Sequence, residues 1–119
     1  MKLAFLTLLS LLLFSCASKP TYEYREAPSI DASSMTAAIP VKLDNLQYPK
    51  KAARNGVEGW VYFEFELNES GEPRNIKVLD SHPEYIFVRE ATKSIRKWQF
   101  KKFPGIEKYR YLLEFKIAN

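Results

Sequence analysis

Two segments of the chain alternate between apolar and polar residues with a period of two, which is typical of a half-buried β-strand. The first, GWVYFEFEL at residues 59–67, has its apolar side chains on one face: Val61, Phe63, Phe65 and Leu67. The second, YRYLLEFKI at residues 109–117, has another such face: Tyr111, Leu113, Phe115 and Ile117. Each segment is therefore predicted to place one face against a core and the other in solvent.

A further strand is expected directly after the first. The connecting residues 68–74, NESGEPR, are rich in turn-forming residues. The following segment 75–81, NIKVLDS, is expected to point Ile76 and Val78 inward. The two strands would then form an antiparallel β-hairpin.

Between the second strand and the last, the apolar period changes to that of a helix. The residues that recur at this spacing are Phe87, Val88, Ala91, Ile95 and Trp98. The opposite face carries Arg89, Lys93, Arg96 and Lys97. This pattern predicts one long amphipathic helix over residues 85–100.

The order of these elements predicts an α+β domain at residues 44–119. The economical packing has two layers, a three-stranded antiparallel sheet covered by one long helix. A short N-terminal helix is expected in YPKKAARNG, where Pro49 suits the first turn and Gly56 the C-terminal cap. A sheet of this kind must end in edge strands with unpaired backbone groups.

The N-terminus carries an apolar run that is typical of an export signal. Lys2 precedes about 15 largely apolar residues, whereas a transmembrane helix needs about 20. The run ends in Leu13-Phe14-Ser15-Cys16, which resembles the lipobox of bacterial lipoproteins, and Cys16 is the only cysteine. Residues 1–15 are therefore predicted to be a lipoprotein signal peptide, with Cys16 lipidated and holding the protein at a membrane. Two alternatives stay open: an ordinary signal peptide with a chance cysteine, and an uncleaved minimal anchor.

Residues 16–43 are predicted to be the lipidated N-terminus and a flexible tether. They contain Pro20, Pro28 and Pro40 among many Ser, Ala and Thr, with no sustained periodicity. In bacterial lipoproteins the residue after the lipidated cysteine directs sorting. Ala17 at that position favours the outer membrane over the inner membrane as the site of a periplasm-facing lipoprotein.

Composition and motifs exclude several classes of function. The formal net charge of +4 at pH 7 is too small to indicate a nucleic-acid partner. The only histidine, His82, precedes a proline in a predicted loop, where a turn residue is the better interpretation than a metal ligand. The sequence has no recognisable nucleophile–base–carboxylate spacing and no glycine-rich phosphate loop. We therefore predict no enzymatic activity, no cofactor and no metal.

A set of short motifs covers residues 44–117. They are Tyr48-Pro49, Glu58-Gly59 opening the first strand, Gly71 in the hairpin, VLDS ending the second strand, Trp98 with Phe100, and YLLEFKI near the C-terminus. In this order and spacing they resemble the C-terminal domain of the TonB family of energy-transducer proteins.

The resemblance implies a partner and a way of binding it. Domains of this family bind a short peptide, the TonB box, near the N-terminus of outer-membrane transporters for siderophores and cobalamin. The peptide adds as a strand beside the last strand of the domain, so that backbone hydrogen bonds supply affinity. Carried over, the pairing residues are Tyr109, Arg110, Tyr111, Leu112, Leu113, Glu114, Phe115, Lys116 and Ile117.

A second group of partner-binding residues is implied near the short helix. Gln47, Tyr48 and Pro49 resemble the stretch that lies against the transporter. Lys51 stands where the family often has an arginine, so it keeps the charge but loses the bidentate fork. The alternative is a purely structural role, with Tyr48 and Pro49 packing at the start of the short helix and with Tyr111 and Phe115 in the core.

Three functions stay open at this stage. The chain lacks the polar-faced inner-membrane helix and the long proline-rich span of energy-transducing members, which favours a lipid-anchored accessory that docks transporters. A structural envelope lipoprotein that pairs its strand edge with another partner is the second. An energy transducer with an uncleaved anchor is the third, and a homodimer formed by strand exchange is compatible with each.

Overall fold

The computed structural model describes residues 24–30 and 36–118. Its centre is β2 (Gly59–Leu67), which pairs antiparallel with β3 (Pro73–His82) on one side and β5 (Tyr109–Phe115) on the other. The sheet order is β3-β2-β5, so both β3 and β5 are edge strands. The predicted three-stranded antiparallel sheet is confirmed.

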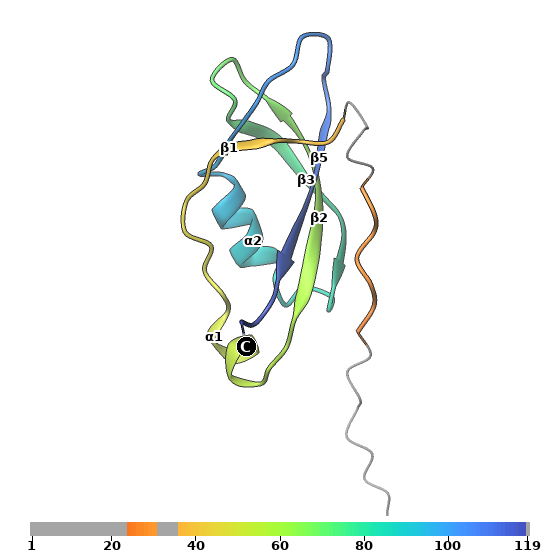
Figure 1. Ribbon diagram of the computed structural model, residues 1–119, viewed down its shortest axis with the longest axis vertical. Coiled ribbons are helices and arrows are strands. Elements are labelled where there is room, and N and C mark those ends of the chain that lie inside the picture. The colour runs from red at the N-terminus through yellow and green to blue at the C-terminus, as the bar shows by residue number, and fades with distance from the viewer. Residues whose placement is uncertain (1–23, 31–35, 119) are drawn as a thin grey trace, which may run out of the picture.

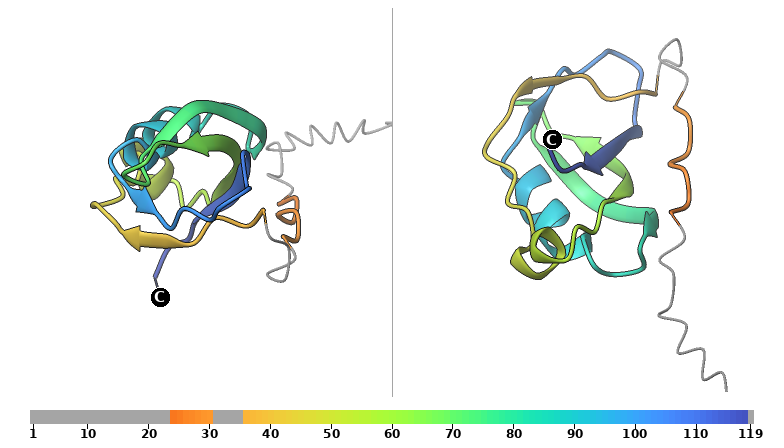
Figure 2. Two further views of the ribbon diagram at one scale, coloured as in Figure 1. Left: turned by 90° about the horizontal axis from the view of Figure 1, so that it is seen from above. Right: turned by 60° about the horizontal axis from the view of Figure 1, so that its bottom comes forward.

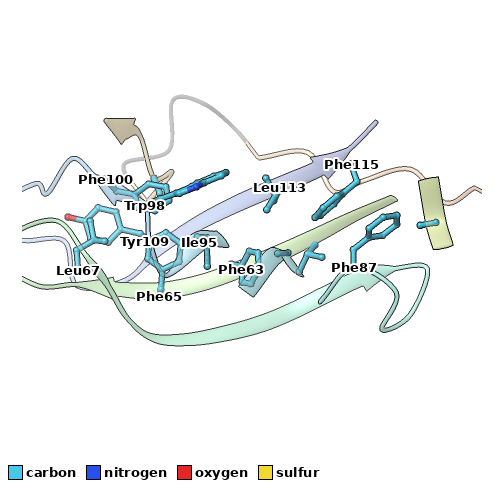
Figure 3. Close-up of a cluster of buried hydrophobic side chains, with 14 residues drawn as sticks. Phe63, Phe65, Leu67, Phe87, Ile95, Trp98, Phe100, Tyr109, Leu113 and Phe115 are labelled. Carbon is cyan, nitrogen blue, oxygen red and sulfur yellow. The ribbon is translucent and has the colours of Figure 1, made fainter. Parts of the chain in front are cut away.

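Helix α2 (Val88–Ile95) covers one face of this sheet (Figure 1), and the hydrophobic core lies between them. The inward residues predicted for β2 are all buried. Alternation along the strand puts them on the same face, and this face packs against the core. At one end of the core Phe87 stacks on Phe115 with ring centroids 4.4 Å apart, and at the other end Phe100, Trp98 and Tyr109 meet (Figure 3). The core therefore joins every element of the predicted domain.

The prediction of one long helix over residues 85–100 is wrong. Only eight residues, Val88–Ile95, are α-helical. Tyr85 has a φ of 67°, which a right-handed helix does not admit. After Ile95 the backbone tightens, since the Lys97 and Trp98 N–H groups donate to the carbonyls three residues before them, Ser94 and Ile95. Trp98 and Phe100 are thus buried like the apolar residues of α2, although they lie beyond the end of the helix.

The chain leaves this turn as a strand. β4 (Gln99–Phe100) pairs antiparallel with β1 (Pro40–Lys42), and the Phe100 N–H donates to the Gly71 carbonyl at 2.8 Å. The short N-terminal helix is confirmed as α1 (Lys50–Arg54), preceded by Pro49 and followed by Gly56 at a φ of 66°.

Two apolar residues are more exposed than predicted. Val78, expected to point inward, keeps 39% of its surface exposed. It lies on an edge strand beside a bulge, where the register with β2 skips from Asp80 to Val78 and leaves out Leu79. Ile117 is 37% exposed, because it follows the end of β5.

Part of the predicted tether lies against the domain. We call residues 24–30 and 36–43 the strap. Residues 24–30 run alongside the sheet on the side away from α2 (Figure 1), and residues 36–43 cross from β5 to β4 (Figure 2). Cys16 and the predicted signal peptide lie outside the described residues.

Candidate docking edge for a partner strand

Strand β5 presents one side of its backbone outward from the sheet. Its other side pairs with β2 from Gly59↔Phe115 to Phe65↔Tyr109. The Arg110 N–H donates to the Thr36 carbonyl at 2.8 Å, and its carbonyl accepts from Ala38 at 2.9 Å, so the backbone of Arg110 faces away from β2. Because backbone groups alternate along a strand, those of Leu112 and Glu114 face the same way.

This outer side has a strand neighbour at only one position within the described residues. Ala37 forms an isolated parallel bridge with Arg110. No described residue pairs with Leu112 or Glu114 on the outer side. The edge therefore offers backbone donors and acceptors from Leu112 onward, which is the arrangement that strand addition requires.

Side chains on the outer face of β5 form a charged surface. Glu64 on β2 lies 3.4 Å from Arg110 and 3.9 Å from Lys108, and Lys116 lies 3.1 Å from Glu114. The Tyr62 hydroxyl, and after it the Glu64 carboxylate, raises the pKa of Arg110. These exposed pairs contribute little to stability, but they fix the charges that a partner strand would meet.

The alternate residues of β5 belong to the core. Tyr109, Leu113 and Phe115 are buried, and the Tyr109 hydroxyl bonds with the backbone of Phe103. Tyr111 packs edge-on against Trp98, with ring centroids 5.9 Å apart, and burial raises the pKa of its hydroxyl. Among the predicted pairing residues, the outward groups are therefore Arg110, Leu112, Glu114 and Lys116.

The second predicted group meets the first through Tyr48. The ring of Tyr48 contacts Phe87 and Phe115 edge-on, with centroids 5.6 and 5.7 Å apart, and its hydroxyl donates to the Val57 carbonyl. Burial, with a smaller contribution from Glu58, raises its pKa. Tyr48 thus fastens α1 to the end of β5, and Pro49 is half-buried beside it.

Gln47 and Lys51 are exposed. Because Tyr48 holds their segment against Phe115, they lie toward the C-terminal end of β5, where a partner on the edge could reach them. Their predicted partner contacts stay a prediction.

The strap, which was not predicted from the sequence, contacts the same sheet. The Trp60 indole N–H donates to the Arg25 carbonyl at 2.8 Å, and the Arg25 guanidinium lies 5.0 Å from the centre of the indole ring. Arg25 also pairs with Asp80 at 2.9 Å and lowers the pKa of that carboxyl. One signal was present: Trp60 shares the polar face of β2 with Tyr62 and Glu64, and a tryptophan there indicates a covering segment.

Neither a metal-binding cluster nor a membrane-spanning helix is found in residues 24–30 and 36–118. No three side chains among His, Cys, Asp and Glu come together in a way that could hold a metal ion. His82 is half-buried near the rings of Tyr24 and Trp60. In the same part of the chain, no helix has the length and apolar character to cross a membrane.

Comparisons with known proteins agree with this architecture. Residues 44–117 match the family model of the Gram-negative bacterial TonB protein C-terminal. The chain is 37% identical to protein TonB of Yersinia enterocolitica over 72 residues, which is 60% of this chain and 28% of that protein. It is 30% identical to protein TonB of Salmonella typhimurium over 87 residues, 72% of this chain and 36% of that protein. The chain thus spans about a third of these relatives or less.

Solved structures are similar as well. The solution structure of the Pseudomonas aeruginosa TonB C-terminal domain superposes with a TM-score of 0.57 at 28% identity, covering 74% of this chain and 93% of that one. The TonB2 protein of Vibrio anguillarum superposes with a TM-score of 0.55 at 32% identity, covering 82% of this chain and 98% of that one.

Proposed function

We propose that this chain, which belongs to the TonB C-terminal domain family, is a periplasmic binding module that receives a strand of an outer-membrane transporter at the β5 edge. The domain of this family is a non-enzymatic interaction module, in agreement with the expectation that the chain is not an enzyme. The observation that carries the proposal is the outward backbone of Leu112 and Glu114, which has no strand partner among the described residues.

The partner that fits this edge is the TonB box, a short extended peptide at the N-terminus of TonB-dependent transporters. An extended peptide would bond to the backbone of Leu112 and Glu114, while Glu114 and Lys116 would select among its side chains. Gln47 and Lys51 are exposed near the same end of β5 and would contact the transporter beyond the peptide.

The proposal includes a lipid anchor. Cys16 would become the acylated N-terminus after removal of residues 1–15, and residues 16–43 would connect it to the domain. Acyl chains contribute about 0.8 kcal/mol per buried CH₂, so the several chains of a bacterial lipoprotein give a durable attachment. The module would then act at the periplasmic side of the cell envelope, as an accessory to transport.

Replacement of Leu112 by proline tests the docking edge. The missing N–H is one that points away from β2, so the sheet keeps its own ladder while a peptide loses a bond. We expect Leu112→Pro to bind a transporter N-terminal peptide at least about tenfold more weakly, equivalent to about 1.4 kcal/mol, by titration calorimetry. Leu112→Ala is the matched control, because it loses the side chain but keeps the N–H.

Two results would contradict parts of the proposal. A Leu112→Pro variant that is folded by circular dichroism and binds as tightly as wild type would show that the peptide docks elsewhere. A wild-type protein that binds no transporter peptide would refute the transporter partnership, and the structural envelope role would replace it.

A further inference from the structure

The chain's own N-terminal segment already occupies the beginning of the proposed docking edge. Thr36 and Ala38 exchange backbone hydrogen bonds with Arg110, at 2.8 and 2.9 Å, in parallel orientation. Ala38 is also buried against the core. At Arg110 the strap makes the bonds that a partner strand would make.

The strap stops where its sequence cannot continue the ladder. In a parallel pair, a residue donates its N–H to the carbonyl of one partner residue, and its carbonyl accepts from the N–H two residues further along the partner strand. Arg110 does this with Thr36 and Ala38, so Leu112 would do it with Ala38 and residue 40. The Leu112 carbonyl would therefore need the N–H of residue 40, and Pro40 has none. The chain instead turns away: Pro40 pairs with Phe100 in the β1–β4 ladder, and the Ile39 carbonyl accepts from Lys101 at 2.8 Å. From Leu112 onward, the outer side of β5 therefore has no strand partner among the residues that the structure describes.

The strap is held at a second place. Arg25 covers the indole of Trp60, accepts its N–H and pairs with Asp80 on β3. Trp60 is 1% exposed although it lies on the outer face of the sheet. The strap is thus fastened near both ends of its described length.

We infer that residues 36–38 are an intramolecular competitor for the β5 edge, which a partner strand must displace to pair with Arg110 as well as with the residues from Leu112 onward. The inference rests on the proposed function and adds its regulation. A peptide that spans Arg110 to Lys116 binds only molecules whose strap has left Arg110. Its apparent dissociation constant is therefore the intrinsic constant divided by the fraction of such molecules. Loosening the strap should therefore tighten peptide binding.

A pair of proline variants in the full chain tests the competition. Ala38→Pro removes the N–H that bonds to Arg110. Ala37→Pro is the control, because the N–H of the central residue of a parallel bridge faces away from the partner strand. For the transporter N-terminal peptide we expect Ala38→Pro to bind about fivefold or more tightly than wild type, and Ala37→Pro to bind as wild type does.

A second variant covers the case in which Ala38→Pro disturbs the core. Arg25→Ala removes the side-chain contacts with Trp60 and Asp80 at the other end of the strap and does not alter the buried residue Ala38. Because the strap is then held less firmly, this variant should also bind the peptide more tightly. Hydrogen exchange gives an independent reading: the Arg110 amide should be protected in wild type and exchange faster in Ala38→Pro.

The outcomes separate the two proposals. If wild type binds the peptide and neither Ala38→Pro nor Arg25→Ala binds more tightly, the competition is refuted and the docking edge stands. If no variant binds, the proposed function fails, and the competition fails with it. An Arg110 amide that exchanges in wild type as fast as in Ala38→Pro would also overturn the strap's role.

Discussion

Single residues show where the fold takes its stability. Trp98 is 4% exposed, donates its indole N–H to the Asp44 carbonyl at 2.9 Å and packs against Tyr111. It joins the segment before α1 to the turn after α2 and to β5. The helical spacing predicted this residue as core, and that prediction is confirmed even though Trp98 lies beyond the end of the helix.

Truncation of Trp98 should therefore be severe. We expect Trp98→Ala to reduce the free energy of unfolding by about 3–5 kcal/mol, since it removes a large buried ring and leaves a cavity. Urea unfolding followed by circular dichroism measures the change. Arg89→Ala on the exposed face of α2 is the control and should stay within about 0.5 kcal/mol of wild type. An unchanged urea midpoint in Trp98→Ala would mean that this face is not the core.

At the scale of elements, the strands could be predicted because alternation of side chains is specific to them. The predicted helix was too long because Trp98 follows Ile95 by three residues. This spacing fits both an α-helix and the tighter turn that ends α2. The position of Trp60 on a polar face hinted at a covering segment, but the pairing of the strap with β5 could not be predicted, since Thr36 and Ala38 bond through backbone groups that any residue possesses. The number of strands predicted that the sheet has edges, and the family resemblance selected the last strand as the docking edge, whereas neither predicted that this edge is partly occupied.

The close approach of Gly59 on β2 to the segment between β3 and α2 can be tested by substitution. A Cβ at Gly59 would overlap the His82 carbonyl oxygen and the Phe87 ring, so only glycine lets these elements approach. We expect Gly59→Ala to lower the thermal midpoint by several degrees or to prevent folding. At Gly105 a Cβ would meet open space, so Gly105→Ala costs only the strain of a φ of 80° in a residue with a side chain. We expect it to reduce the free energy of unfolding by about 1 kcal/mol. Equal losses in the two variants would refute the close approach.

At the scale of the whole molecule, the proposed lipid decides where the module works. We expect the native protein to carry acyl chains on Cys16 and to lack residues 1–15, and Cys16→Ser to carry none. Intact-mass measurement of protein extracted from membranes, with palmitate labelling of both forms, checks this. A mass that still contains residues 1–15 would favour the uncleaved anchor and an energy-transducing role.

The docking of the strap has a consequence for how far the module can search. If Cys16 holds the lipid and the strap is released, about 27 residues separate the membrane from the domain, with an extreme reach of about 90 Å. With Tyr24 and Arg25 held on the sheet, only residues 17–23 remain, which can span at most about 25 Å in any conformation. Because effective concentration falls with about the −3/2 power of tether length, shortening the tether from about 27 to about 7 residues raises the effective concentration of a partner near the attachment point roughly eightfold. The contacts at Trp60 and at Arg110 together would thereby keep the domain close to the bilayer, and release of both would let it reach further into the periplasm.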